Sequence, residues 1–276
     1  MKKKNIVVLV VGLVLIALLL IGIFLVPSAS GDESINEEMR DEVLHEVNKI
    51  NLFGTEVNPG LISAFTVTGI IFVFALIVRI FVIPKFTLVP NKFQLILETA
   101  VGTFDDMAKG HSPGRNKFLG AYIFTAAAYI FVGTMFELLG LQAVTTFGRS
   151  VSLPAPLADI NGAITMGCVS YLVILSGGIA SNGIKGVGKT LKDFSLPVSM
   201  SFRLFGALLS GALVTELVYY FTALSFVLPV VVGVLFTLLH ALIQAYVLTM
   251  LTSLFYGEVS EKKTIKIKNR KEVIKK

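Results

Sequence analysis

The chain has 276 residues, of which 54% are hydrophobic and 15% charged, and its mean hydropathy is +0.81. Because a soluble domain carries about 25% charged residues, this composition excludes an ordinary soluble protein and predicts a membrane protein. A formal net charge of +6 is also typical of nucleic-acid-binding proteins, but the basic residues lie beside apolar segments, where the positive-inside rule accounts for them, so we expect no nucleic-acid partner.

Six apolar segments reach about 20 residues, the length needed to cross the apolar core of a bilayer. They span residues 5–26, 61–83, 118–141, 161–181, 197–224 and 226–256. We therefore predict an all-α, polytopic membrane protein with five core membrane helices over residues 61–256 and one further apolar segment at the N terminus.

The N-terminal segment, residues 1–30, has two interpretations. It begins with Lys2, Lys3 and Lys4 and ends in small residues near Ala29, which is typical of a cleaved signal peptide. Its apolar run exceeds the about 7–15 residues of a signal peptide, which favours a retained anchor helix. Both interpretations leave the five core helices unchanged.

The charges between the apolar segments predict one orientation, because Lys and Arg concentrate in cytoplasmic connections. Residues 31–60 are acidic and are expected outside. The connections 84–117 and 182–196 are rich in Lys and are expected inside. The basic tail, residues 257–276, is expected in the cytoplasm.

Two of these connections have helical periodicity. Apolar residues recur at helical spacing over 35–50, which fits either a short amphipathic helix or a solvated linker. Residues 92–109 predict an amphipathic helix that lies along the inner surface of the membrane.

The sequence gives no basis for a metal or a cofactor. The lone Cys168 excludes a CxxC pair, and the three histidines are too far apart for an HExxH motif. Gly183, Gly188, Lys189 and Thr190 have the spacing of a P-loop, but they lie in a short connection between spans with no soluble strand before it. We interpret this match as a chance one and expect no nucleotide site.

The last two spans contain polar residues that are costly in hydrocarbon and therefore tend to mark an ion path. They are Arg203, Glu216, His240 and Gln244. Almost no connection separates the two spans, so we predict an antiparallel hairpin of long helices, tilted because 28 residues rise about 42 Å against an apolar core of about 30 Å. Residues equidistant from the turn then share a depth, which places Arg203 level with Tyr246 or Val247. By the same count, Ser210 is level with His240.

Small residues accompany the arginine. Gly206, Ala207 and Ser210 lie on the same predicted helix face as Arg203. Small side chains let another helix approach closely. The pattern fits a site that meets a partner helix, and it also fits an ordinary packing seam with Arg203 bonded to carbonyl groups.

At this point the sequence resembles a known family. Residues 197–206 (PVSMSFRLFG) resemble the signature of subunit a of F-type ATP synthases. Residues 136–140 (FELLG), 156–161 (PLADIN) and 240–252 (HALIQAYVLTMLT) are similar to further motifs of that family, in the family's order.

The resemblance implies an ion-translocating stator subunit that is not an enzyme by itself and binds no cofactor. In that family an arginine faces the rotating ring of c subunits, and two half-channels carry H+ or Na+ to and from the ring. This implies the arginine role for Arg203, and Gln244 matches the family's glutamine. The implied partners are the c-subunit ring, the b-subunit peripheral stalk, the F1 sector and membrane lipid, in a bacterial cell (inner) membrane with a cytoplasmic C terminus.

The sequence departs from the family pattern in the channel lining. Ala212 stands where the family has a carboxylate, and Thr237 stands where it has His or Glu. Glu216 is one turn beyond Ala212 and His240 is three residues after Thr237, so both remain near the expected helix faces. The candidate residues for ion translocation are thus Arg203, Gln244, Glu216, His240 and Ser210, with Asp159, Asn161, Glu137 and Thr237 as candidates for the channel lining.

Two other functions remain open. A secondary ion transporter or channel would use Glu216 and His240 as a proton relay, but an internal repeat typical of such folds is not visible. A non-transporting membrane scaffold would bind anionic lipid or a partner through its basic tail, but this leaves the cost of Arg203 and Glu216 unexplained.

Overall fold

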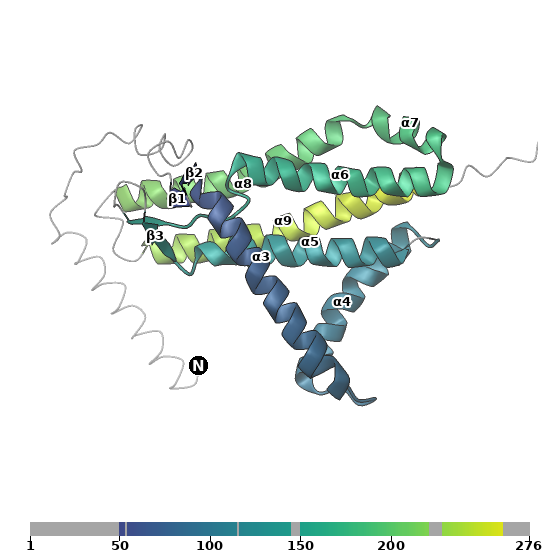
Figure 1. Ribbon diagram of the computed structural model, residues 1–276, viewed down its shortest axis with the longest axis horizontal. Coiled ribbons are helices and arrows are strands. Elements are labelled where there is room, and N and C mark those ends of the chain that lie inside the picture. Colours follow the sequence, from purple (N-terminus) through teal and green to yellow (C-terminus); the bar gives the residue numbers. More distant parts are fainter. Residues whose placement is uncertain (1–49, 53, 115, 145–149, 221–227, 262–276) are drawn as a thin grey trace, which may run out of the picture.

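The computed structural model describes residues 50–52, 54–114, 116–144, 150–220 and 228–261 (Figure 1). The N-terminal segment, most of the acidic segment, the turn between the last two spans and the tail beyond residue 261 fall outside these residues. Expectations for those parts stay predictions. The described chain is mostly helical, as predicted.

The five predicted core membrane helices are confirmed, because five helices of the described chain are long and apolar enough to cross a membrane. They are α3 (Pro59–Ile77), which continues through the π-helical turn η1 (Val78–Val82) and the 3-10 turn η2 (Ile83–Lys85), α5 (Asn116–Glu137), α6 (Ile160–Asn182), α8 (Ser195–Tyr220) and α9 (Leu228–Ser260). Their bounds agree with the predicted spans to within about one helical turn. The span predicted over 118–141 ends early, at Glu137, because Gly140 takes a positive φ of 58° and a strand begins at Gln142.

Four of these helices form a bundle. The helices α5, α6, α8 and α9 run side by side, and α3 crosses them obliquely (Figure 1). The core between the bundle helices includes Leu119 and Ile130 of α5 and Leu204 and Leu208 of α8. Only 11% of the α3 span is buried, against 44% of the α5 and α6 spans, so α3 is peripheral and open to lipid.

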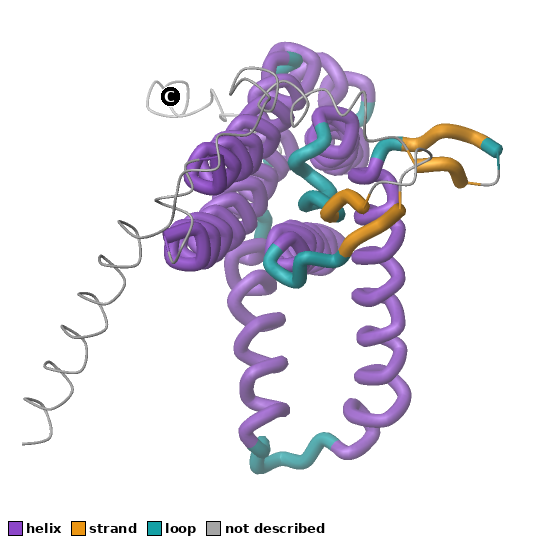
Figure 2. Tube along the Cα trace, turned by 90° about the vertical axis from the view of Figure 1, so that its left-hand side faces the viewer, coloured by secondary structure: helices purple, strands orange, loops and turns teal. Residues whose placement is uncertain are grey.

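The predicted amphipathic helix over 92–109 is present as α4 (Lys92–His111). It begins where the Asn91 side chain accepts a hydrogen bond from the Gln94 backbone N–H (2.9 Å), the usual way to cap a helix N terminus. Figure 2 shows α3 and α4 as two arms that leave the bundle and join at their far ends through the loop 86–91. The location of α4 on the inner surface of the membrane stays a prediction.

The connection 182–196, which we expected to be a loop, contains the helix α7 (Ile184–Lys192). This helix folds back on α6 and packs so closely that a Cβ on Gly186 would collide with the Gly178 backbone. Thr190 is buried, and its hydroxyl donates to the Gly186 carbonyl (3.1 Å). A helix, not a strand, precedes the P-loop-like sequence, and its threonine is engaged, which argues against a phosphate site.

Two short antiparallel hairpins were not predicted. They are β1 (Ile50–Leu52) with β2 (Thr55–Val57), and β3 (Gln142–Val144) with β4 (Ser150–Ser152). Both lie at the same end of the bundle (Figure 1). The helical pattern expected up to residue 50 is wrong at its last position, because Ile50 begins a strand and is buried beside Val67 and Phe136.

Gly186→Ala is expected to destabilise the protein by about 1–3 kcal/mol, because its Cβ would force α6 and α7 apart. Gly188→Ala, on the same helix, is the matched control: nothing lies near its Cβ, and Ala is the better helix former by about 1 kcal/mol. Thermal unfolding in detergent should show a lower midpoint for Gly186→Ala and no loss for Gly188→Ala. Equal midpoints would show that the backbone contact between α6 and α7 is dispensable.

Candidate functional site

Arg203 lies on the outward face of α8. The adjacent face of the helix carries Met200, Leu204 and Leu208, which repeat every four residues and are 1–3% exposed in the bundle core. Arg203 is itself exposed, and it has no hydrogen bond or ion pair within the described chain. A membrane helix thus presents a cation away from its own bundle.

Small residues lie one and two turns from Arg203 on this face, beside the large exposed side chain of Phe202. Ser199, Gly206 and Ser210 precede or follow Arg203 by one or two turns, and all three are exposed. The Ser210 hydroxyl donates to the Ala207 carbonyl (2.8 Å), so it is satisfied within its own helix. The predicted small-residue face is therefore present and lies open, which favours a partner helix over a packing seam within this chain.

Gln244 lies on the buried face of α9. It is 6% exposed and has Ala241, Ala245 and Leu248 as buried neighbours on the same helix. Its side-chain oxygen Oε1 accepts no hydrogen bond within the described chain. Leaving such an acceptor unpaired costs about 1–3 kcal/mol, so packing alone does not explain a glutamine at this position.

His240 packs against α8. A Cβ on Gly211 would lie 3.2 Å from the His240 Nδ1, a tight contact that the ring could relieve only by shifting. On its own helix, His240 contacts Phe236, with ring centroids 5.8 Å apart. The hairpin predicted from the sequence has His240 level with Ser210. The observed contact of His240 is with Gly211, the residue after Ser210.

Two more close contacts fix how α6 lies against its neighbours. A Cβ on Gly167 of α6 would collide with Ser201 of α8, and a Cβ on Gly177 of α6 would collide with Tyr256 of α9. The helices α6 and α8 are antiparallel, as are α8 and α9 (Figure 1). Each contact therefore sets which residues share a depth.

The first shared level contains the arginine. Counting at about 1.5 Å per residue from these contacts, Arg203 is level with Thr165 of α6 and Leu248 of α9. The contact between α6 and α9 places Thr165 level with Gln244, so the two counts along α9 differ by one turn. The predicted match of Arg203 with Tyr246 or Val247 holds to within about two residues.

The second shared level lies about 10 Å along α8 from Arg203, toward the end where α6 begins. By the same count it contains Asp159, Ser210 and His240 from three helices. Polar groups that are far apart in sequence therefore gather at two depths of one bundle.

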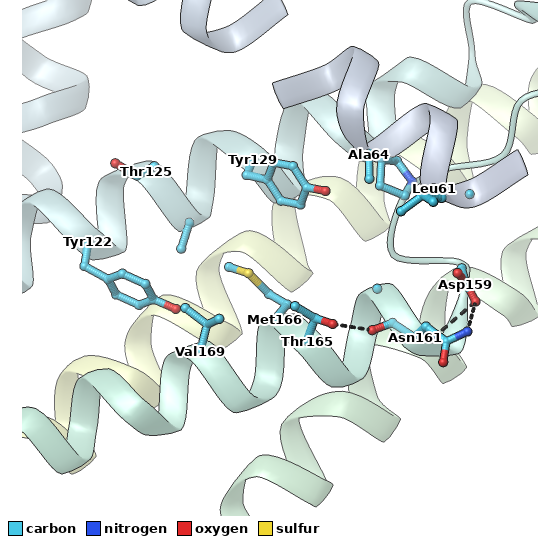
Figure 3. Close-up of a pocket in the computed structure, with 14 residues that line it drawn as sticks. Leu61, Ala64, Tyr122, Thr125, Tyr129, Asp159, Asn161, Thr165, Met166 and Val169 are labelled. Carbon is cyan, nitrogen blue, oxygen red and sulfur yellow. Dashed lines mark hydrogen bonds between the residues drawn. The ribbon is translucent and has the colours of Figure 1, made fainter. Parts of the chain in front are cut away.

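Asp159 and Asn161 form the beginning of α6 (Figure 3). Asp159 is only 9% exposed and caps the helix, accepting from the Asn161 backbone N–H (3.2 Å) and side-chain Nδ2 (3.4 Å). The α3 helix begins against this cap, where Asn58 accepts from the Gly60 N–H (2.9 Å). A Cβ on Gly60 would lie 2.8 Å from the Asp159 Cβ, so only glycine fits between the two helix starts.

A cavity of about 430 Å³ lies beside this cap, between α3, α5 and α6. Figure 3 shows Tyr122 of α5 reaching toward Val169 of α6, while Tyr129 of α5 extends toward Ala64 of α3. Most of the lining is apolar, and the polar groups are the tyrosine, threonine, asparagine and aspartate side chains. The cavity connects the Asp159 level with the Thr165 level.

The remaining candidates are less well placed. Glu137 is the last residue of α5 and is partly buried, and Thr237 is partly exposed on α9, three residues before His240. Glu216 belongs to α8, about 20 Å along the helix from Arg203, but its side chain lies outside what the structure describes.

Thr165 was not singled out from the sequence. It follows Asn161 by one turn, and its hydroxyl donates to the Asn161 carbonyl (2.7 Å). The signal was available, because residues four apart share a helix face. It was overlooked because a threonine is inexpensive inside a membrane helix when it bonds to its own backbone.

The fold and these residues define a polytopic membrane protein whose last helices carry cationic, amide and imidazole groups at shared depths. Residues 61–257 match the sequence model of the family described as ATP synthase A chain. The chain is also similar to ATP synthase subunit a of two strains of Cereibacter sphaeroides, ATCC 17025 / ATH 2.4.3 and ATCC 17029 / ATH 2.4.9. Each is 27% identical over 180 residues, which cover 61% of this chain and 69% of the relative.

Because the family match spans well over half of the chain, this protein belongs to the ATP synthase subunit a family. The resemblance seen in the sequence is thereby confirmed. The chain is a non-catalytic membrane subunit with an ion-translocating stator role in the F0 sector, and it is not an enzyme by itself.

Two substitutions at Asp159 separate its capping role from its charge. Asp159→Ala removes the cap and should lower the stability of the protein by about 1 kcal/mol, whereas Asp159→Asn keeps an acceptor for the Asn161 N–H and should not. Thermal unfolding measures the cap, and ion transport by the assembled complex measures the charge. If Asp159→Asn transports ions at the parent rate, the carboxylate serves only as a cap.

Proposed function

We propose that this chain couples the flow of H+ or Na+ to ATP synthesis or hydrolysis by presenting Arg203 to the carboxylates of a rotating c-subunit ring. The observation that carries the proposal is an exposed arginine beside small residues of a membrane helix, with no hydrogen bond or ion pair to any other described residue. A cation there is costly in hydrocarbon unless an anion of another subunit meets it. Family membership supports that other subunit being part of the same synthase.

The guanidinium suits this task physically. A guanidinium stays charged at any working pH. It can therefore attract an emptied ring carboxylate, favour release of the ion and block leakage between the two sides. An arginine does this without carrying the ion itself.

We further propose that two half-channels lead to the ring, one of them lined by the level of Asp159, Ser210 and His240. Glu216 extends that level along α8, and Asn161 extends it along α6. The common depth of these groups on three helices supports a water-linked path. Gln244, buried with a free acceptor beside the arginine level, is proposed to hold the ion or water near Arg203.

The proposed partners are the c-subunit ring, the b-subunit peripheral stalk, the F1 sector and membrane lipid. We propose a bacterial cell (inner) membrane with the C terminus in the cytoplasm. The support is the charge asymmetry, with acidic residues in 31–60 and basic residues in 84–117, 182–196 and 257–276.

A secondary transporter with Glu216 and His240 as a relay within one chain is less well supported. Such a relay uses groups that face one another inside the bundle. Arg203 faces away from the bundle, so a mechanism confined to this chain gives it no role.

Arg203→Ala and Arg203→Lys are both expected to lower coupled ATP synthesis at least about 100-fold, or about 2.7 kcal/mol, while the complex still assembles. Lysine fails because its compact ammonium can lose its proton when desolvated and lacks the planar fork of arginine. The measurement is ATP synthesis by reconstituted complex under an imposed ion gradient.

The control is Lys185→Ala, which removes an exposed cation from α7 and should leave synthesis near the parent rate. Substantial synthesis by either assembled Arg203 variant would refute the proposed role.

Glu216→Gln should slow ion transport about tenfold, because it removes a charge from the path while keeping the shape. His240→Ala should have a milder effect. Leu239→Ala, an exposed apolar neighbour of His240, is the control and should transport normally. Silver-ion inhibition of cysteines placed at 216 and 240 tests whether water reaches both positions. Inaccessible cysteines, together with unchanged rates, would exclude these residues from the path.

A further inference from the structure

A second cavity, of about 560 Å³, lies apart from the candidate site, between α3, α4 and α5. These three helices form the sides of a triangle in Figure 1, with α3 and α4 meeting at its tip. The lining is overwhelmingly apolar and includes Ile71, Phe74, Val78, Leu97, Phe124 and Val132. A cavity of this composition in a membrane protein is suited to a hydrocarbon chain.

Cations are concentrated at the tip of the triangle. Arg79 lies in η1, Lys85 ends η2 and Lys92 begins α4, and all three are exposed. The loop between the two lysines exposes Leu88 and Val89, which are 103% and 83% accessible. Exposed apolar side chains flanked by lysines are typical of a segment at the headgroup level of a membrane, where the chains face hydrocarbon and the cations face phosphate.

Carboxylates near the cavity do not cancel these cations. Asp105 is paired with Lys109 (2.6 Å), and this hydrogen bond and charge raise the pKa of Lys109. Glu98 accepts a hydrogen bond from the Gln94 Nε2 (2.7 Å) and has no ion pair within the described chain. The tip therefore keeps an excess of positive charge beside an apolar cavity.

We propose that this cavity and its tip bind one anionic phospholipid, with an acyl chain between α3, α4 and α5 and the phosphate at Arg79, Lys85 and Lys92. Basic pockets between membrane helices on the cytoplasmic side select anionic headgroups. The lipid fills the space that α3 leaves as it diverges from α5, and it ties the peripheral helix to the bundle. The proposal does not depend on the role of Arg203.

The chain contains no tryptophan, so one introduced indole reports its own surroundings. Phe74→Trp places the indole in the cavity. Phe72→Trp is the matched control, because Phe72 is 62% exposed at almost the same depth but does not line the cavity. The full-length chain is reconstituted in phosphatidylcholine vesicles that contain a minority of either brominated phosphatidylglycerol or brominated phosphatidylcholine.

Bromine quenches an indole that it touches, so the ratio of the two quenching efficiencies measures selectivity. Phe74→Trp should prefer phosphatidylglycerol by about fivefold for each cation that contacts the phosphate. Phe72→Trp should show no preference. Adding Lys85→Gln and Lys92→Gln to Phe74→Trp should lower the preference to the about fivefold that Arg79 alone supports, whereas adding Lys117→Gln, at the start of α5, should leave it unchanged.

Equal quenching of Phe74→Trp by the two lipids would overturn the proposal. A photoreactive phosphatidylglycerol in the assembled complex provides a second measurement. Crosslinks to peptides of α3 and α5 at the cavity are expected. Their absence in the complex would also overturn the proposal and would indicate that a protein helix fills the space.

Discussion

Close contacts at glycines hold this membrane bundle in register. Gly167 against Ser201, Gly177 against Tyr256 and Gly211 against His240 join α6, α8 and α9 in pairs, each without room for a Cβ of normal contact distance. Because each helix is tied to the other two, a shift of one helix would break two contacts at once. The depth of every polar group on these helices follows from that register.

This register bears on the free-energy cost of placing polar side chains inside a membrane bundle. Asp159 bonds to Asn161 and Ser210 bonds to its own helix, so each of these polar groups has a local partner at its depth. Asp159 also caps α6, so one side chain stabilises the helix start and contributes a charge at the second level. Gln244 is the exception, since its acceptor is buried and unpaired within the described chain.

Much of this was predictable, because membrane spans follow from the length of apolar runs and shared faces follow from the helical period. The five core helices, α4 and the near match of Ser210 with His240 came from those two rules. The two hairpins and α7 did not, because they depend on tertiary contacts. Ile50 is drawn into a strand by packing on Val67 and Phe136, and α7 is held by Gly178. The space requirement at Gly60 is likewise invisible without Asp159 beside it.

The outer surface of the chain is divided in the way that two kinds of neighbour require. Around Arg203 the exposed residues Ser199, Gly206 and Ser210 are small, so a neighbouring helix can come close there, and a single large side chain, Phe202, lies beside them. Along α3 the exposed side chains include Phe72 and Phe81, which project into their surroundings and would obstruct such an approach. Large apolar side chains instead gain from contact with lipid that adapts to them. A close helical neighbour therefore suits the small residues of the α8 face, and lipid suits the α3 face.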